Sequence, residues 1–182
     1  SFHNMGRITR AKPVKLIAGF IFKDEKYLRN AEAVLARKFG KIDFKSQSMP
    51  FNFTDYYAQE LGSNLKRAFI SFQNLICPKS LSSVKAVTNH IEKNLSSGGN
   101  RLINIDPGYL DAARLILAST KDYAHRVYLD KGIFAEITLI FKGHSFKALE
   151  WTYPDYKSEE YIDIFHKIRE IFLRQCQPIP RT

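Results

Sequence analysis

The sequence predicts a single α+β domain in which helices pack on an antiparallel or mixed sheet. Three observations predict this class. Apolar runs of strand length alternate with amphipathic helical segments, three strand-like runs follow one another past the middle of the chain, and an amphipathic segment closes the pattern. With 182 residues, of which 45% are hydrophobic, the chain is long enough to bury one sizeable core.

The first half of the chain has the order strand, helix, strand, strand, helix, strand. The apolar run Val14–Phe22 follows Pro13 and fits a buried strand, Asp24 can cap the next helix, and Gly40 can end it. We expect further strands at residues 42–46, 65–75 and 102–105, and a helix carrying Val84, Val87, Ile91 and Leu95 on one face. This is the order of the ferredoxin-like βαββαβ motif, which we consider for the first half, extended or flanked by the rest.

The connection Met49–Gly62 is rich in aromatic residues, and Pro50 indicates irregular backbone. If Tyr56 and Tyr57 are exposed, they are candidates for ligand binding, because tyrosine combines apolar area with a polar tip. The alternative, which we favour, is that this loop folds over the core and its aromatic side chains fill a satellite cluster.

In the second half, Asp106 and Pro107 resemble a helix start, with aspartate as the N-cap and proline at the first helical position. That helix would turn Leu110, Ala113 and Leu117 toward the core. A three-stranded meander is then expected at residues 125–129, 133–141 and 146–150, with hairpin loops at 130–132 and 143–144. Ser158 is expected to cap a final helix with an apolar face that carries Tyr161, Ile164, Phe165, Ile168, Ile171 and Phe172.

The meander predicts one core face and one mixed face. Period-two alternation puts on the core face Ile133, Ala135, Ile137, Leu139 and Phe141, and on the mixed face Phe134, Glu136, Thr138 and Ile140. The expected loop lengths place Leu129 opposite Ile133, and both Arg126 and Trp151 opposite Glu136, although a one-residue slip would break this row. The row is either the floor of a pocket or a cross-strand ion pair with a packed tryptophan.

Residues 101–156 hold the candidate functional residues. The expected ligand-binding residues are Arg101, Asp106, Lys121, Arg126, Glu136, Trp151, Tyr153 and Asp155. The catalytic candidates are Asp122, His125 and Glu136, since an aspartate three residues before a histidine is suited to proton transfer or metal binding. For Asp106 and for the turn at 151–156, the structural alternatives are helix capping and a seal between the final helix and the sheet.

The chain is basic, with a formal net charge of +10. Residues 1–45 hold eleven lysines and arginines against four acidic residues, so most of the excess lies in this quarter. The excess is either a solvated face or a surface for phosphates and nucleic acid. Cys77 and Cys176 have no metal-binding spacing, and the sequence holds no apolar run of transmembrane length and no secretory signal pattern, so we expect a cytoplasmic protein.

The domain is expected to span residues 5–176. Residues 1–4 precede Met5 and are expected to be the remnant of an expression tag, and residues 177–182 a tail. The sequence contains none of the motifs GxxxxGK[ST], GxGxxG, HExxH, CxxC or GxSxG, so a nucleotide site here would be built without a P-loop.

Four segments in order resemble a known family: TDYYAQELG at 54–62, NIDPGYL at 104–110, TKDYAHRVYLDKGIFAEITL at 120–139 and WTYPDY at 151–156. The resemblance is to the bacterial domain-of-unknown-function family 4416, and it extends over about residues 15–156. Members often carry the label "GTP-binding protein". The resemblance therefore implies an uncharacterised cytoplasmic protein with a link to nucleotides, and it assigns no catalytic residue, metal or cofactor.

Three functions are consistent with these observations. The leading one is binding of a phosphorylated small ligand or nucleotide, for which Arg126, Lys121 and Arg101 supply charge and Trp151 and Tyr153 supply stacking. Replacing Arg126 with alanine should then abolish binding and leave the fold intact. The alternatives are a metal-assisted hydrolase or transferase, with Asp106, Asp122, His125 and Glu136 converging on one ion, and an RNA-binding module that uses the basic N-terminal quarter.

Overall fold

The computed structural model describes residues 6–177. The expected tag remnant at 1–4 and the expected tail after Gln177 lie outside the described residues. Within them, nine strands form one antiparallel sheet, and four α-helices pack on it, which confirms the α+β class. No helix between residues 6 and 177 is both long and apolar enough to span a membrane.

The strands are β1 (Val14–Phe22), β2 (Ile42–Lys45), β3 (Met49–Pro50), β4 (Lys66–Ile76), β5 (Ile103–Leu110), β6 (Arg114–Ser119), β7 (Arg126–Asp130), β8 (Ile133–Lys142) and β9 (Ser145–Ala148). The α-helices are α1 (Glu25–Phe39), α2 (Ala58–Leu61), α3 (Leu81–Asn94) and α4 (Glu159–Gln175), and two short 3₁₀ helices are η1 (Pro78–Ser80) and η2 (Pro154–Lys157).

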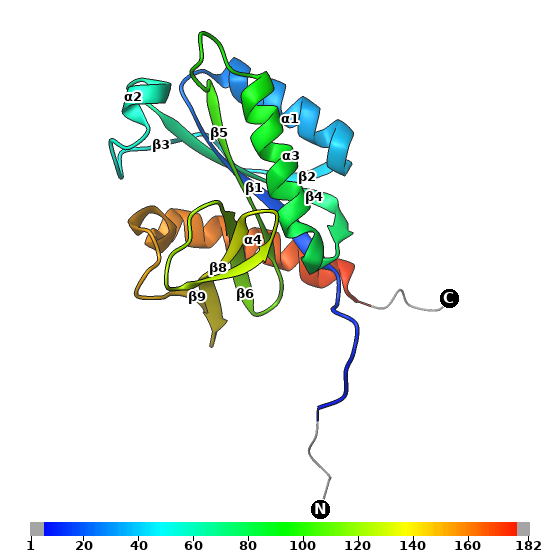
Figure 1. The fold of residues 1–182 in the computed structure, drawn as a ribbon. Coiled ribbons are helices and arrows are strands. Elements are labelled where there is room, and N and C mark those ends of the chain that lie inside the picture. Colours follow the sequence, from blue (N-terminus) through cyan, green and yellow to red (C-terminus); the bar gives the residue numbers. More distant parts are fainter. Residues whose placement is uncertain (1–5, 178–182) are drawn as a thin grey trace, which may run out of the picture.

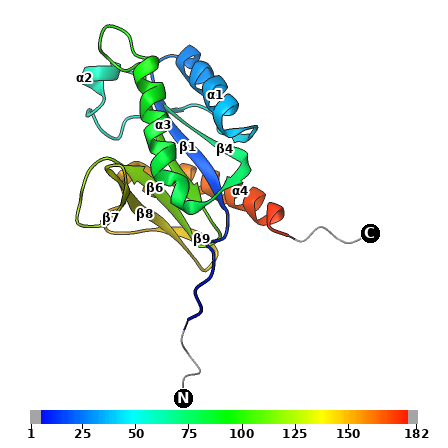
Figure 2. The same ribbon diagram turned by 45° about the vertical axis from the view of Figure 1, so that its right-hand side comes forward.

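The first half has the strand order β2-β4-β1-β5, and every neighbouring pair is antiparallel. This is the strand order of the ferredoxin-like motif, with β1 and β4 in the centre. Helices α1 and α3 lie side by side on one face of these strands, and α4 covers the other face (Figures 1 and 2). Strand β6 and the meander of β7, β8 and β9 extend this sheet in the order β5-β6-β8-β7, with β9 pairing with β8.

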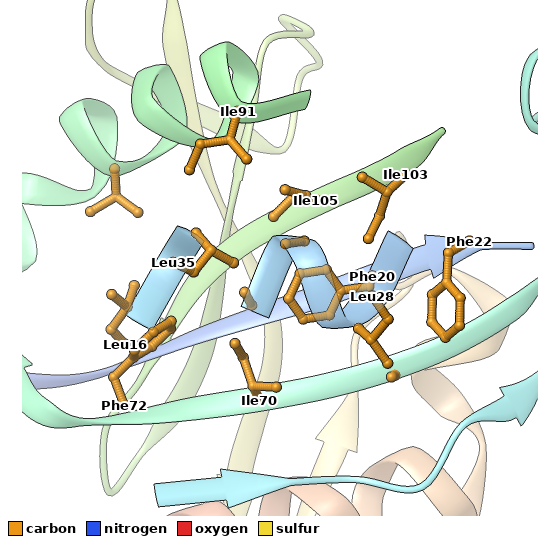
Figure 3. Close-up of a cluster of buried hydrophobic side chains, with 14 residues drawn as sticks. Leu16, Phe20, Phe22, Leu28, Leu35, Ile70, Phe72, Ile91, Ile103 and Ile105 are labelled. Carbon is orange, nitrogen blue, oxygen red and sulfur yellow. The ribbon is translucent and has the colours of Figure 1, made fainter. Parts of the chain in front are cut away.

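Strand β1 is buried on both faces, which explains its nearly continuous apolar sequence. Its residues Leu16, Phe20 and Phe22 point into the cluster beneath α1 and α3, where Leu35 and Ile91 meet them from the two helices (Figure 3). On the opposite face, Ile17 belongs to the cluster under α4. Burial on two sides makes this strand the centre of the fold.

The expected helix boundaries follow from capping. Asp24 accepts a hydrogen bond from the backbone nitrogen of Lys26 at 2.9 Å, and α1 ends before Gly40, whose φ is 97°. Ser158 accepts one from the backbone nitrogen of Tyr161 at the start of α4. These side chains satisfy backbone donors that the first helical turn leaves free.

The expected helix after Asp106 is wrong, because β5 continues through this segment. All eight residues of β5 pair with β1, including Asp106 with Gly19 and Pro107 with Ala18. Leu110 and Leu117 face the core from the two arms of a hairpin, not from one helix. Asp111 closes the turn of that hairpin by accepting hydrogen bonds from the backbone nitrogens of Ala113 and Arg114.

The expected core face of the meander is wrong at Ile137, which is 38% exposed. Between Ile137 and Leu139, strand β8 has one residue more than β6, so Thr138 forms a β-bulge and the alternation changes phase. Ile133 therefore packs on the α3 side of the sheet, whereas Leu139 packs on the α4 side. Glu136, expected on a mixed face, is buried.

The predicted pairing of Arg126 with Glu136 is confirmed. A bulge at Leu129 shortens the hairpin loop to two residues, so Asp130 lies opposite Ile133 in place of Leu129. The predicted two-residue loop Gly143–His144 is also confirmed, but β9 ends at Ala148 and does not reach Trp151. The Trp151 indole instead donates a hydrogen bond to the carbonyl oxygen of Ile137, next to the bulge.

Candidate ligand-binding pocket

A pocket of about 800 Å³ opens where β5 and β6 separate. The two strands pair only through Gly108–Leu110, so Ile103–Pro107 has no neighbour in the sheet on that side. Gly108 lies at the point of separation, and a Cβ there would clash with the carbonyl oxygen of Ile116. Residues of α3 line the pocket from one side of the sheet and residues of η2 from the other.

Arg67 forms the inner end of the pocket. It lies on β4, is 3% exposed, and its Nη2 donates a 2.7 Å hydrogen bond to Oδ2 of Asp155. Four aromatic rings surround the guanidinium, with centroids 5.1 to 5.8 Å from its central carbon, and they belong to Phe51, Phe69, Tyr156 and Tyr161. The buried charge is thus held by one close carboxylate and by cation–π contacts.

Asp106 projects from β5 into the pocket between two cations. Its Oδ2 accepts a 2.7 Å hydrogen bond from Asn104 and lies 3.7 Å from Nη1 of Arg67, and its Oδ1 lies 3.8 Å from Nζ of Lys85 on α3. Lys85 is nearly buried and donates a long hydrogen bond to the carbonyl oxygen of Ile105. Asp106 is therefore the counter-ion that Arg67 and Lys85 share, and we call these three residues the pocket floor.

Arg101 ties three segments together beside this floor. It donates two 2.7 Å hydrogen bonds to Glu60 on α2, one of 2.6 Å to Glu92 on α3 and one of 2.8 Å to Asn104 on β5. Hydrogen bonds from Arg101 lower the pKa of Glu60, whereas burial raises the pKa of Glu92 in spite of its ion pair. Arg101 is thus already neutralised by two carboxylates.

Glu136 forms the β8 wall and contacts three neighbouring side chains. Its Oε1 contacts Nε2 of His125 at 2.8 Å and accepts from Nε of Arg126 at 3.1 Å, and its Oε2 accepts from Thr138 at 3.1 Å. Arg126 also donates to Ser119 and to the carbonyl oxygen of Lys121. The His125 ring stacks on the indole of Trp151, with centroids 5.3 Å apart.

The mouth of the pocket is aromatic and basic. Nζ of Lys121 lies 3.3 Å from the hydroxyl of Tyr56 and 4.6 Å from the centre of its ring, which joins the loop after β6 to the aromatic loop after β3. Tyr56 also packs edge-on against Tyr57, whose pKa is raised by burial. Exposed Tyr123 and Tyr153 line the same pocket.

The charges that line the pocket do not balance. Six cations face four carboxylates, and four of the cations have carboxylate partners: Arg67 with Asp155, Lys85 with Asp106, Arg101 with Glu92, and Arg126 with Glu136. Lys93 and Lys121 form no ion pair with any residue between 6 and 177. These two exposed lysines are therefore the lining cations whose charge no carboxylate among residues 6–177 neutralises.

A comparison with protein-family models identifies the family of the chain. The family model described as Domain of unknown function (DUF4416) matches residues 12–172. The chain belongs to this family. Searches of the curated proteins and of the solved structures gave no match. All four segments that carry the resemblance to DUF4416 contribute to the pocket lining, for example through Tyr56, Asp106, Glu136 and Asp155.

The pocket brings together seven of the eight expected ligand-binding residues of this DUF4416 chain: Arg101, Asp106, Lys121, Arg126, Glu136, Tyr153 and Asp155. Trp151 supports the wall from outside through His125. Of the catalytic candidates, Glu136 lines the pocket, whereas Asp122 and His125 lie outside its lining. The carboxylate next to His125 is Glu136, not Asp122.

Sequence reasoning missed Arg67 and Lys85, and the expected ligand-binding residues did not include Tyr156 although the turn at 151–156 was considered. A charged residue near the start of a strand normally points to solvent, and a lysine on an amphipathic helix normally lies on its solvated face. One signal was available in the strand alternation. Arg67 lies on the same face of its strand as Phe69 and Ser71, and both of these residues are fully buried. The aromatic box around Arg67 comes from segments far apart in the chain and has no local signature.

The four side chains considered as metal ligands, Asp106, Asp122, His125 and Glu136, do not form one cluster. Among the described residues, no group of three or more histidine, cysteine, aspartate and glutamate side chains is arranged to hold an ion. Asp106 belongs to the cationic floor, whereas Glu136 and His125 belong to the β7–β8 wall. Each of these carboxylates already has a cation as its partner.

Proposed function

We propose that the pocket binds a phosphorylated small ligand or nucleotide without a P-loop. The observation that carries the proposal is the surplus of two lysines, Lys93 and Lys121, on the lining of a pocket with an aromatic mouth. A phosphate group needs positive charge that carboxylates have not already neutralised, and these two ammonium groups supply it.

The aromatic residues support a planar group on the same ligand. Tyr56, Tyr123 and Tyr153 are exposed at the mouth. Lys121 lies over the ring of Tyr56 and Arg126 over the ring of Tyr123. Tyr153 is therefore the first candidate on which a base can stack. Base–aromatic stacking contributes roughly 1–3 kcal/mol per base in nucleic-acid complexes. The volume of about 800 Å³ lies within the usual range for small-molecule sites.

A thermal-shift screen of nucleotides, each with and without Mg²⁺, tests the proposal. A ligand present at about a hundred times its Kd stabilises a native protein by about 2.7 kcal/mol, which shifts Tm by several degrees in a domain of this size. Guanine nucleotides belong in the panel because of the label that family members carry. We expect at least one nucleotide or sugar phosphate to raise Tm.

Two variants make the test specific to the mouth. Lys93→Ala and Lys121→Ala remove exposed side chains, and ligand affinity should fall about tenfold for each lost charge contact. The unliganded Lys93→Ala protein should keep its Tm, and the Tm of Lys121→Ala should fall only slightly, because its contact with Tyr56 is exposed. Lys147→Ala, on exposed β9, is the matched control and should bind like the unmodified protein. Absence of a shift with every nucleotide, or equal binding by all three variants, would reject the proposal.

No observation favours the other two functions over this one. Metal-assisted hydrolysis and RNA binding remain predictions from the sequence, as does the cytoplasmic location. RNA binding would appear as affinity that falls steeply with salt.

A further inference from the structure

The inner end of the pocket has hydrogen-bonding groups without partners. Among residues 6–177, four buried side-chain atoms lack a hydrogen bond: Nε and Nη1 of Arg67 and the hydroxyl oxygens of Tyr156 and Tyr161. All four belong to one place, since both tyrosine rings lie within 5.8 Å of the Arg67 guanidinium. Buried polar groups in proteins are nearly always paired, so a cluster of four indicates a missing partner.

The missing partner is a hydrogen-bond acceptor. The nitrogens of Arg67 can only donate. The two hydroxyls are protonated at neutral pH, because burial raises the pKa of Tyr156 well above its ordinary value and that of Tyr161 to about 12. Arg67 and Tyr156 line the pocket, and Tyr161 packs behind them with its ring 5.8 Å from that of Tyr156.

The same partner is neutral. Arg67 and Lys85 at the inner end are matched by Asp155 and Asp106, so the cluster has no surplus charge for an anion. An oxyanion placed against Arg67 would also lie near two carboxylates, which would repel it. The free positive charge lies at the mouth, on Lys93 and Lys121.

We propose that the inner end at Arg67 and Tyr156, with Tyr161 packed behind them, is a subsite for a neutral group that carries oxygen or nitrogen acceptors, such as the ring of a nucleobase. This inference rests on the proposed function and adds an orientation to it. The ligand enters with its neutral ring toward Arg67 and leaves its phosphate at the mouth, near Lys93 and Lys121.

The test uses substitutions that remove only a hydroxyl group. Tyr156→Phe and Tyr161→Phe keep the aromatic packing around Arg67, and Tyr27→Phe on α1, remote from the pocket, is the matched control. The probes are the four nucleoside monophosphates and ribose 5-phosphate, which has the same phosphate and sugar but no base. Affinity is measured by calorimetric titration, and the Tm of each unliganded variant is recorded.

We expect at least one nucleoside monophosphate to bind at least about tenfold more tightly than ribose 5-phosphate. Tyr156→Phe should weaken that nucleotide about two- to tenfold, as for one lost hydrogen bond, and leave ribose 5-phosphate unchanged. Tyr161→Phe should have a smaller effect, because Tyr161 lies behind the pocket lining. The unliganded pocket variants should keep or exceed the Tm of the unmodified protein, because they lose a group without a partner.

The outcomes separate the two proposals. If no probe binds the unmodified protein, the proposed function fails and the inference fails with it. If nucleotides bind but Tyr156→Phe binds them as the unmodified protein does, only the inference is overturned. A clear fall in Tm for both unliganded variants would also overturn it, since the hydroxyls would then already be paired, for example with a buried water.

Discussion

Arg67 on β4 and Asp155 on η2 form a buried ion pair across 88 residues of sequence, with 2.7 Å between Nη2 and Oδ2. The pair links η2, which precedes α4, to strand β4 in the middle of the sheet, at the inner end of the pocket. Its energetics follow from burial, because each charge would be costly in this apolar surrounding without the other.

Replacing Asp155 with alanine should lower the free energy of unfolding by about 3–5 kcal/mol, since Arg67 would keep a buried charge without its close partner. Urea denaturation followed by circular dichroism measures the change. Asp163→Ala removes an exposed carboxylate from α4 and should stay within about 0.5 kcal/mol of the unmodified protein. Combining Asp155→Ala with Arg67→Met should recover part of the loss, and a single variant as stable as the control would contradict the ion-pair account.

Replacing Arg126 with alanine should destabilise the fold as well as the pocket. The sequence suggested a variant that keeps its fold, but the Arg126 side chain is 4% exposed and bonds Glu136, Ser119 and the backbone of Lys121. Its loss leaves buried Glu136 with His125 and Thr138 as partners, at a cost of about 3–5 kcal/mol in unfolding free energy. Thermal or urea unfolding checks this against Arg37→Ala on the exposed face of α1, and equal stability of the two variants would refute it.

Gly108→Ala should destabilise the protein by about 1–3 kcal/mol, as expected for overpacking. The reason is steric, since a Cβ at this position would meet the carbonyl oxygen of Ile116 and a methyl group of Leu117. The backbone there is not left-handed, so conformational strain adds nothing. Gly6→Ala, where a Cβ meets nothing within 4 Å, is the control. A Gly108→Ala variant with unchanged unfolding would show that β5 and β6 can move apart at little cost.

Stability should fall at alkaline pH because of Tyr161. Burial raises its pKa from 10.0 to about 12 in the folded protein, so between these values the unfolded chain releases a proton that the folded chain keeps. The contribution of Tyr161 is therefore fully present below pH 10 and is lost as the pH rises toward about 12. Urea unfolding across this pH range should show that the free energy of unfolding declines less steeply for Tyr161→Phe than for the unmodified protein. Identical pH profiles for the two proteins would mean that Tyr161 does not carry the effect.

The helical and strand elements that depend on local sequence were predictable. The buried run at Val14–Phe22, the cap at Asp24, the cap at Ser158 and the pairing of Arg126 with Glu136 all appear as expected, although the loop between β7 and β8 is one residue shorter. Each rests on neighbouring residues, through apolar periodicity, a side chain that reaches its own helix terminus, or a short loop that fixes the register.

Two elements went differently because distant strands overrode a local preference. Asp106 and Pro107 have the chemistry of a helix start, but β1 offers a pairing partner along the whole of β5, and Asp106 bonds Asn104 and faces Lys85 instead of capping a helix. The bulge at Thr138 exchanges the two faces of β8 for the residues that follow it. The extra residue is defined only by the pairing of β8 with β6, so the alternation within β8 does not predict it.

For the pocket, the sequence by itself determined the inventory of charged and aromatic residues between 101 and 156, and seven of the eight residues that it singled out line one pocket. Only the tertiary structure decided which charges are neutralised. Ion pairing depends on distances between atoms that the fold brings together. In the fold, carboxylates neutralise Arg67, Arg101 and Arg126, whereas Lys93 and Lys121 at the mouth have no carboxylate partner within residues 6–177.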